Sequence, residues 1–384
     1  MGILQRVKSL VKLNCPSHVY YEMVRVWHAV CGKKTGEPVY PDWQESINDP
    51  RCDVALREMM LSYDKGQGEN ASQYWRILCN KNIAQLVDHG FAQFKRTVAR
   101  DYFTFIVNRA NPQFRFLEAA LSAADRRAAW DACAGTKANE FMDQDQARLF
   151  DYMTFMMWKY VQTQGLGGIL NKIEEPELGA PFSVMVNGRR ITQDLLNSIL
   201  EYDSMRQGVG DFEEVKEVLE VGAGYGRTAF VIRSLHPHVN YTIADIPPAL
   251  YVSQRYLSEM FKGQNVFRYR KGADIDTASE EWRSARMRFI TPAQLQKLSG
   301  VKADLFLAVD CLHEMRKDVI DVYFGRAHAL ASKMYYKCWK ETTIPYDKIT
   351  LREHDYPVRP SWERVYHRSC RIQQTYFEAV YRIV

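Results

Sequence analysis

A glycine-rich segment and an acidic residue downstream of it have the types and spacing of a ligand-binding turn. Residues 220–226 read Glu-Val-Gly-Ala-Gly-Tyr-Gly and follow an apolar stretch. Glycines at such a turn remove side chains, so the backbone can approach a ligand, and they tolerate positive φ angles. Asp245 ends the next apolar stretch, about 20 residues further on, where a carboxylate can accept hydrogen bonds from ribose hydroxyls. The predicted ligand contacts are Glu220, Gly222, Ala223, Gly224, Asp245 and Ile246.

The glycine spacing distinguishes two classes of ligand. A dinucleotide turn has the pattern Gly-x-Gly-x-x-Gly, which would require a glycine at position 227, where this chain has Arg227. An acid two residues before Gly-x-Gly-x-Gly is instead typical of methyltransferases. S-adenosylmethionine has no pyrophosphate but carries an ammonium and a sulfonium, and an acid such as Glu220 suits those cations. We therefore predict S-adenosylmethionine as the cofactor, with a nicotinamide-dependent dehydrogenase as the alternative.

A second group of polar residues, Asp310, His313 and Glu314, follows a strand predicted at 304–309. Ligands bind at the carboxyl ends of the strands in parallel sheets. There His313 could remove the proton of an acceptor hydroxyl, with Glu314 or Asp310 orienting its ring. The alternative is a histidine that caps a helix or is satisfied within the core. The residues predicted to line the adenine, with a plain loop as the alternative, are Phe289, Ile290 and Thr291.

The first half of the chain has helical periodicity. Apolar residues recur at three- and four-residue intervals in the stretches 74–87, 91–107 and 148–161. Glycines and prolines predict loops at 35–50 and 65–68. We expect a mainly helical domain over residues 1–185 and a connecting helix over 186–210.

From residue 211 to 384, short apolar runs alternate with helical segments. This alternation predicts a parallel sheet covered on both faces, and the charged stretch 270–288 is expected to be a solvated loop. Two β-rich runs at 362–367 and 376–384 suggest an antiparallel hairpin that closes the sheet. The other strands are predicted at 215–221, 239–244, 304–309 and 333–339, and the helices at 226–235, 248–261 and 318–331.

Several longer runs resemble the sugar O-methyltransferase family. They are residues 219–227, 244–257, 312–315 and 377–381, with shorter upstream runs at 72–75, 94–97 and 194–201. The resemblance covers about residues 70 to 384. It implies an α/β fold with a Rossmann-like seven-stranded methyltransferase sheet, an N-terminal helical domain and S-adenosylmethionine as cofactor.

The resemblance also bears on the group around His313. Its segment is similar in position to a Leu-His-Asp-Trp segment of small-molecule O-methyltransferases, in which the histidine is the base. Asp310 and His313 resemble the Asp-x-x-His pair of metal-dependent sugar methyltransferases as well. Those enzymes place two further acids after the next strand, where this chain has Lys340 and the single acid Glu341. We therefore predict no metal.

Composition excludes several classes of function. The net charge of +5 is mild and no dense Lys/Arg stripe appears, so no nucleic-acid partner is expected. None of the eight cysteines lies in a Cys-x-x-Cys pair, no signal peptide is apparent and no apolar run is long enough for a membrane span. The expected location is the cytoplasm. Apolar residues at helical spacing from Ile3 to Val11 indicate either a packed amphipathic helix or an interfacial membrane helix.

Together these features predict an O-methyltransferase that acts on a hydroxyl of a sugar, a glycosylated metabolite or a related natural product. N- or C-methylation of a natural product is one alternative, and a non-catalytic binding protein with the same fold is another. The helical domain should select the acceptor and is a candidate surface for homodimer formation. The residues considered for acceptor contact are Tyr74, Trp75, Lys95, Arg96 and Tyr102.

Overall fold

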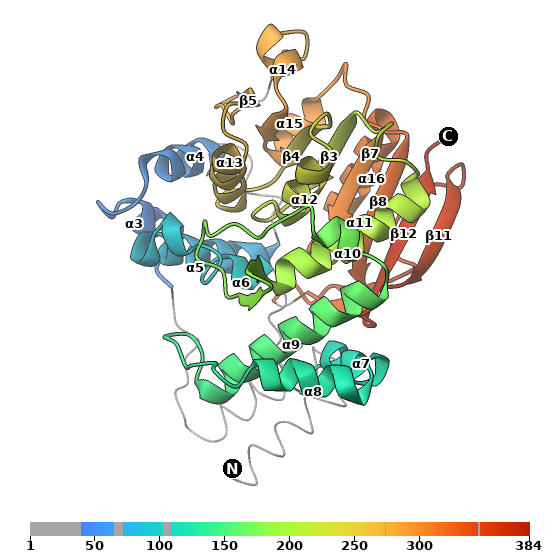
Figure 1. Ribbon diagram of the computed structural model, residues 1–384. Coiled ribbons are helices and arrows are strands. Elements are labelled where there is room, and N and C mark those ends of the chain that lie inside the picture. The colour runs from blue at the N-terminus through green and yellow to red at the C-terminus, as the bar shows by residue number, and fades with distance from the viewer. Residues whose placement is uncertain (1–39, 65–71, 103–108, 273, 345) are drawn as a thin grey trace.

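The computed structural model describes residues 40–64, 72–102, 109–272, 274–344 and 346–384. The predicted N-terminal amphipathic segment and the loop at 65–68 lie outside the described residues. A central sheet carries helices on both faces, and further helices extend from one side of it (Figure 1). The strands are β1 (Val184–Val186), β2 (Arg189–Ile191), β3 (Glu217–Val221), β4 (Asn240–Ala244), β5 (Val266–Phe267), β6 (Met287–Ile290), β7 (Leu305–Val309), β8 (Lys333–Trp339), β9 (Glu341–Thr343), β10 (Thr350–Arg352), β11 (Glu363–Ser369) and β12 (Tyr376–Arg382).

The α-helices differ in length from one turn to five. They are α3 (Trp43–Ile47), α4 (Val54–Asp64), α5 (Gln73–His89), α6 (Ala99–Tyr102), α7 (Pro112–Ala120), α8 (Ala123–Ala132), α9 (Gln144–Thr163), α10 (Gly167–Leu170), α11 (Gln193–Val209), α12 (Arg227–Leu235), α13 (Ala249–Met260), α14 (Glu280–Ser284), α15 (Pro292–Lys297) and α16 (Lys317–Leu330). Two 3-10 helices are η2 (Phe91–Gln93) and η3 (Leu312–Glu314).

The main sheet is Rossmann-like, as predicted. Its strand order is β11-β12-β8-β7-β3-β4-β6-β5, in which β12 is antiparallel to both of its neighbours. The strands from β3 to β8 pair in parallel. The predicted closing hairpin is confirmed, and the two-residue strand β5 adds an eighth strand to the expected seven. Since the chain leaves β3 towards β4 but leaves β7 towards β8, a crevice is expected where the carboxyl ends of β3 and β7 meet.

The strand sequences explain this architecture. Every residue of β7 is buried, as expected for a parallel strand covered on both faces. Alternate side chains of the sheet enter two apolar clusters, one with α11, α12 and α13 and the other with α15 and α16. The first cluster continues into α4, α5 and α9, so the N-terminal helices share a core with one face of the sheet.

The N-terminal region is helical where the periodicity was strongest, at α5 and α9. The segment predicted as a loop at 35–50 contains α3, whose first turn is capped by Asp42. The described part of the helix predicted over 91–107 is not continuous, because η2 and α6 are separate. The N–H of Lys95 donates to the carbonyl of Gly179 at 3.1 Å instead of continuing a helix. In the connecting segment, β1 and β2 form a hairpin before α11 begins at its cap, Thr192.

The charged stretch 270–288 is not a solvated loop throughout. Trp282 of α14 is buried and Arg288 of β6 is only 2% exposed. The Arg288 Nη1 atom pairs with Glu217 Oε2 at 2.6 Å, and its guanidinium lies over the Trp282 ring. The ion pair with Glu217 therefore stabilises the buried position of Arg288 in the sheet.

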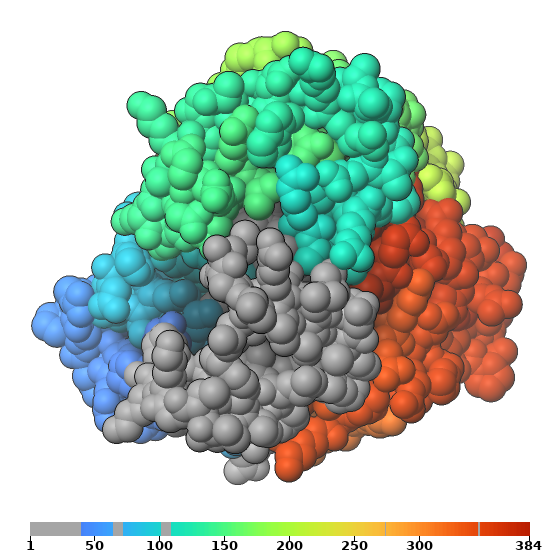
Figure 2. Space-filling model, turned by 90° about the horizontal axis from the view of Figure 1, so that it is seen from below, coloured from blue at the N-terminus to red at the C-terminus, as the bar shows by residue number. Residues whose placement is uncertain are grey.

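Seen from below, α7, α8 and α9 lie at the top of the molecule, with the blue N-terminal helices and the orange-red C-terminal segments on opposite sides beneath them (Figure 2). Within the described residues, no helix has both the length and the apolar character that crossing a bilayer requires.

Candidate active site

A cavity of about 250 Å³ opens at the carboxyl ends of β3, β4 and β7. Its walls come from the glycine turn, the segment after β7, the start of α15 and α16, and the N-terminal helices α4 and α5. The residues that line it include Tyr63, Ser72, Trp75, Glu220, Gly222, Ala223, Gly224, Tyr225, Arg227, Asp245, Ile246, Pro292, Ala293, Gln296, Asp310, Cys311, Glu314, Met315, Arg316, Asp318 and Tyr323. Six of the predicted cofactor contacts therefore lie around one cavity.

The glycine turn passes close to the segment that follows β7. Gly222 has a φ of 65°, and a Cβ atom there would lie 2.5 Å from the Cβ atom of Cys311. The Cys311 thiol in turn donates to the carbonyl of Val221 at 3.2 Å. Both the positive φ and the close approach require glycine at position 222, so the turn is built to bring two strand ends together.

Asp245 faces the turn from the end of β4. Its Oδ2 atom accepts from the N–H of Gly224 at 2.9 Å, and its Oδ1 atom accepts from the N–H of Ile246 at 2.7 Å. Burial raises the pKa of Asp245 to about 7 despite these two hydrogen bonds. The carboxylate is thus fixed in orientation at the cavity wall and costly to ionise without a further partner.

Glu220 is the second acid of the glycine segment, and its side chain is almost completely buried at the back of the cavity. Its Oε2 atom accepts a hydrogen bond from the Tyr241 hydroxyl at 2.9 Å. Burial raises the pKa of Glu220 to about 8. A cation entering the cavity would favour the ionised form of this carboxyl group.

Asp310 belongs to a buried ionic cluster below the cavity. Its Oδ2 atom accepts from Arg227 Nη2 at 3.0 Å and from Lys337 Nζ at 3.1 Å. Both cations also bind Glu201, which lies on α11. Two buried cations hold one oxygen of this carboxylate, and no hydrogen bond joins it to His313 among the described residues, so its role in orienting that ring stays a prediction.

The same residue has two features of a ligand-facing group. Its φ is 58°, a left-handed conformation that non-glycine residues adopt infrequently. Its Oδ1 atom is buried at the cavity wall and has no hydrogen-bond partner among the described residues. Helical and strand periodicities do not reveal this cluster, because its members are scattered from α11 to β8.

His313 and Glu314 are adjacent in the 3-10 helix η3 but face different surroundings. His313 does not line the cavity: its side chain is 5% exposed and its ring packs against Trp339 and Tyr376. Burial lowers the pKa of His313 to about 3, so the ring is neutral at physiological pH. Glu314 lines the cavity, and burial raises the pKa of its carboxyl group to about 8. The Nε2 atom of His313 lies 3.8 Å from Glu314 Oε1.

The residues predicted to line the adenine do not line this cavity. Phe289 and Ile290 are fully buried in β6, and Thr291 caps α15 by accepting from the N–H of Gln294 at 3.3 Å. Because α15 begins immediately afterwards, the cavity is lined by the next residues, Pro292 and Ala293. The cavity wall at this point therefore begins one residue after the predicted segment.

Of the N-terminal candidates for acceptor contact, Trp75 lines the cavity. Lys95 is instead buried, where its ammonium pairs with Glu175 and donates to the Tyr256 hydroxyl. Arg96 donates to the carbonyl of Ala180 at 2.5 Å and lies over the ring of Phe182.

The remaining two candidates are Tyr74 and Tyr102. Tyr74 packs against the second apolar cluster, and the side chain of Tyr102 lies outside the described residues. Two other residues of the N-terminal region line the cavity, Tyr63 and Ser72, and neither was among the acceptor candidates. Ser72 caps α5 and its hydroxyl donates to the carbonyl of Glu314 at 3.1 Å, which ties the N-terminal helices to η3.

The charge of the cavity wall is mainly acidic. Arg227 is engaged by Glu201 and Asp310, and Arg316 pairs with Asp318 at 2.9 Å. The three remaining carboxyl groups have no Lys or Arg partner among the described residues. These three are Glu220, Asp245 and Glu314. Such a wall favours a ligand with positive charges and hydroxyl groups over a pyrophosphate.

No protein-family model and no curated protein matches the chain. Among solved structures, it is similar to the mitomycin 7-O-methyltransferase MmcR, with 10% identity, a TM-score of 0.35 and coverage of 86% of this chain and 83% of that one. It is also similar to the magnesium protoporphyrin IX methyltransferase of Synechocystis PCC 6803 with bound S-adenosylhomocysteine, with 13% identity, a TM-score of 0.35 and coverage of 59% and 97%.

A third similar structure is the glycopeptide N-methyltransferase MtfA complexed with sinefungin, with 13% identity, a TM-score of 0.33 and coverage of 48% and 93%. Likeness at these low values assigns neither a family nor a substrate. The resemblance to sugar O-methyltransferases is therefore not confirmed.

Proposed function

We propose that the chain binds S-adenosylmethionine in this cavity and transfers its methyl group to a hydroxyl of a sugar or glycosylated metabolite. The main support is Asp245, whose carboxylate is held against the glycine turn by the N–H groups of Gly224 and Ile246. This carboxylate is available to ribose hydroxyls at the edge of the cavity.

The chemistry of the wall supports this cofactor over a dinucleotide. S-adenosylmethionine would bring an ammonium and a sulfonium to the carboxyl groups of Glu220 and Glu314, whose pKa values are raised by burial. A pyrophosphate would add negative charge beside the same groups, and Arg227 is already held by Glu201 and Asp310. Pro292 and Ala293 offer an apolar surface for the adenine.

When bound, the cofactor supplies an activated methyl group for in-line displacement by an acceptor oxygen. The protein must then orient the acceptor and take up its proton. We assign the proton to the Glu314 carboxylate, because it faces the cavity and its pKa of about 8 suits a base. His313, 3.8 Å behind it, acts as a positioning residue. The earlier expectation that His313 is the base becomes the alternative.

The acceptor would enter beside α4 and α5. Trp75 and Tyr63 line this part of the cavity, and aromatic rings offer a flat apolar surface to the C–H face of a sugar. A hydroxyl acceptor needs a base to take up its proton, whereas an amine acceptor needs a weaker one. The presence of Glu314 as a candidate base therefore favours O-methylation over N-methylation. In this proposal the helical region up to residue 185 selects the acceptor, residues 186–210 connect, and residues 211–384 hold the cofactor.

Calorimetric titration with S-adenosylhomocysteine tests the cofactor assignment. We expect saturable binding by the wild-type chain and about 100-fold weaker binding by Asp245→Ala, since the variant loses hydrogen bonds from the ligand to a charged group. Asp321→Asn, an exposed acid on α16, is the control and should bind like wild type. If the folded wild type bound nicotinamide dinucleotides but not S-adenosylhomocysteine, the proposal would be wrong.

A further inference from the structure

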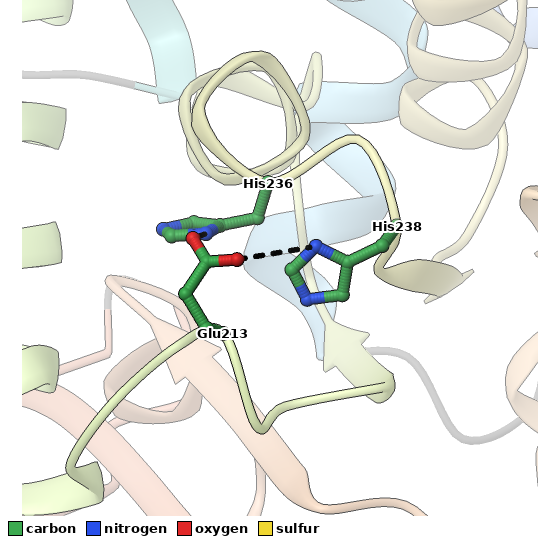
Figure 3. Close-up of side chains that lie close together, drawn as sticks. All are labelled: Glu213, His236 and His238. Atoms are coloured by element: carbon green, nitrogen blue, oxygen red, sulfur yellow. Dashed lines mark hydrogen bonds and ion pairs between the residues drawn. The ribbon is translucent and has the colours of Figure 1, made fainter.

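Two histidines and a glutamate meet at the edge of the sheet opposite the cavity. Glu213 lies in the loop before β3, while His236 and His238 flank Pro237 in the turn between α12 and β4. One donor atom from each of the three side chains lies within 4.8 Å of the other two. Figure 3 shows the Glu213 carboxylate between the two imidazole rings. The sequence analysis did not single out these residues.

Each carboxylate oxygen of Glu213 faces the Nδ1 atom of one of the two histidines. The Nδ1 atom of His236 lies 2.9 Å from Glu213 Oε1, and the Nδ1 atom of His238 lies 3.9 Å from Glu213 Oε2. Ligand atoms around a tetrahedral zinc ion are separated by roughly 3 to 3.5 Å, given metal–ligand distances of about 2.0–2.1 Å. Small movements of two exposed side chains would therefore bring all three donors to bonding distance.

The far side of the His236 ring supports metal binding through Nδ1. Its Nε2 atom lies 2.7 Å from the Tyr202 hydroxyl, which can either donate to or accept from that nitrogen. A metal ion would replace the proton with which Nδ1 donates to Glu213 Oε1, and Nε2 would then carry the ring proton and donate to Tyr202. Histidines that bind metals almost always donate their other ring N–H in this way.

Of the three side chains, His236 is held rigidly, whereas Glu213 and His238 can change position. His236 is buried and its ring stacks on Phe212, with 5.5 Å between the ring centroids. The buried guanidinium of Arg233 donates to the carbonyls of His236, Pro237 and Val239, which fixes the backbone of the turn. The side chains of Glu213 and His238 are 67% and 37% exposed and are free to close on an ion.

We propose that Glu213, His236 and His238 bind a zinc ion that ties the loop before β3 to the turn before β4. Two imidazoles and one carboxylate suit zinc better than magnesium or calcium, which prefer oxygen ligands. The fourth position is open to water. The five residues of β3 separate this site from the glycine turn, so its role is structural and independent of the proposed methyl transfer.

A simple His–Glu ion pair is the competing explanation, and it requires only His236. The second imidazole distinguishes the two, because the His236–Glu213 pair forms without His238, whereas a metal ion would have His238 as one of three ligands. His236 itself is a poor test position, because its ring is part of the core and its loss threatens folding. His238 and Glu213 are exposed enough to change without disturbing the core.

The experiment is a zinc titration of the chelator-treated full chain, followed by calorimetry and by thermal melting. We expect one equivalent of zinc to bind and to raise the melting temperature of the wild type. His238→Ala and Glu213→Gln should each weaken this binding at least about 10-fold and abolish the rise in melting temperature. Tyr202→Phe, which keeps every ligand, should weaken binding about 10-fold.

His354→Ala is the matched control, because this histidine is exposed and belongs to no such cluster among the described residues. It should bind zinc like the wild type. Zinc binding that is absent from the wild type, or equally tight in His238→Ala and wild type, would overturn the proposal. S-adenosylhomocysteine titration of His238→Ala should match wild type, so failure of either proposal is seen separately.

Discussion

Acidic residues at the two edges of the parallel sheet have different partners. At the amino-terminal edge, Glu217 pairs with Arg288 at 2.6 Å, and Asp304 accepts from the N–H groups of Lys216 and Glu217 at 2.7 and 3.0 Å. At the carboxyl-terminal edge, Glu220, Asp245 and Glu314 face a cavity, and burial raises the pKa of each. The acids named at the amino-terminal edge have a cation or backbone N–H groups as partners, whereas at the carboxyl-terminal edge these three acids, unlike Asp310, have no Lys or Arg partner among the described residues.

This difference indicates where the molecule gives up stability for ligand binding. A buried carboxyl group without a partner destabilises the fold in its ionised form, whereas a paired one does not. The loops after the strands of a parallel sheet carry its ligand chemistry, and the three unpaired acids lie in those loops or at those strand ends. The predictions below test this contrast.

The largest effect is expected from Glu314→Gln. Loss of a general base should lower kcat by about 100- to 10,000-fold, measured as S-adenosylhomocysteine formation with a panel of sugars and glycosides. In the wild type kcat/KM should rise with pH towards a pKa near 8, because the base must be deprotonated, and the variant should lose that dependence.

His313→Asn separates base from positioning residue in the same assay. A loss of less than about 10-fold with the pH dependence retained fits positioning. A larger loss than in Glu314→Gln would return the base role to His313. Glu214→Gln, an exposed acid before β3, is the control and should keep full turnover.

Lys337→Met should strongly destabilise the fold. Burial alone would lower the pKa of Lys337, but Asp310 and Glu201 beside it raise that pKa above its usual value. Removing this cation leaves two buried carboxylates with only Arg227, which should cost about 3–5 kcal/mol of unfolding free energy. Denaturant unfolding measures the loss, with the exposed Lys302→Met as control. A change below about 1 kcal/mol would show that the cluster is dispensable.

A smaller effect is expected for Glu220→Gln, and it should depend on pH. The folded-state pKa of about 8 lies above the usual 4.5, so between these values the folded chain keeps a proton that the unfolded chain has lost. Stability therefore falls as pH rises through this window. The variant should equal wild type at pH 5 and exceed it by about 1 kcal/mol or more at pH 8.

Thermal or denaturant unfolding at both pH values measures this difference. Glutamine keeps an oxygen that can accept from the Tyr241 hydroxyl, so the hydrogen bond itself is not lost. If the unfolding free energies of the two proteins had the same pH dependence, burial would not raise the pKa of Glu220 in the folded state.

Local sequence was sufficient to predict the glycine turn, Asp245 and most of the parallel sheet. For the strands and helices predicted from residue 211 onwards, each bound lies within two residues of the observed one. The periodicities of buried strands and of amphipathic helices are properties of neighbouring residues, and the glycine turn is one continuous segment. Periodicity did not predict the described part of 91–107 correctly. There the N–H of Lys95 donates to the carbonyl of Gly179 instead of to a carbonyl within a helix.

Only the tertiary structure decided which side of η3 faces the cavity. His313 and Glu314 are neighbours, and a shift of one position exchanges a group packed between Trp339 and Tyr376 for one at the cavity wall. The sequence by itself determined the strands, the glycine turn and the place of Asp245 at the end of β4, because each of these depends on contiguous residues. The ionic cluster of Asp310, the cavity wall from α4 and α5, and the His–Glu group at the far edge depend on segments distant in the chain. Packing alone brings those segments together, and no local pattern records it.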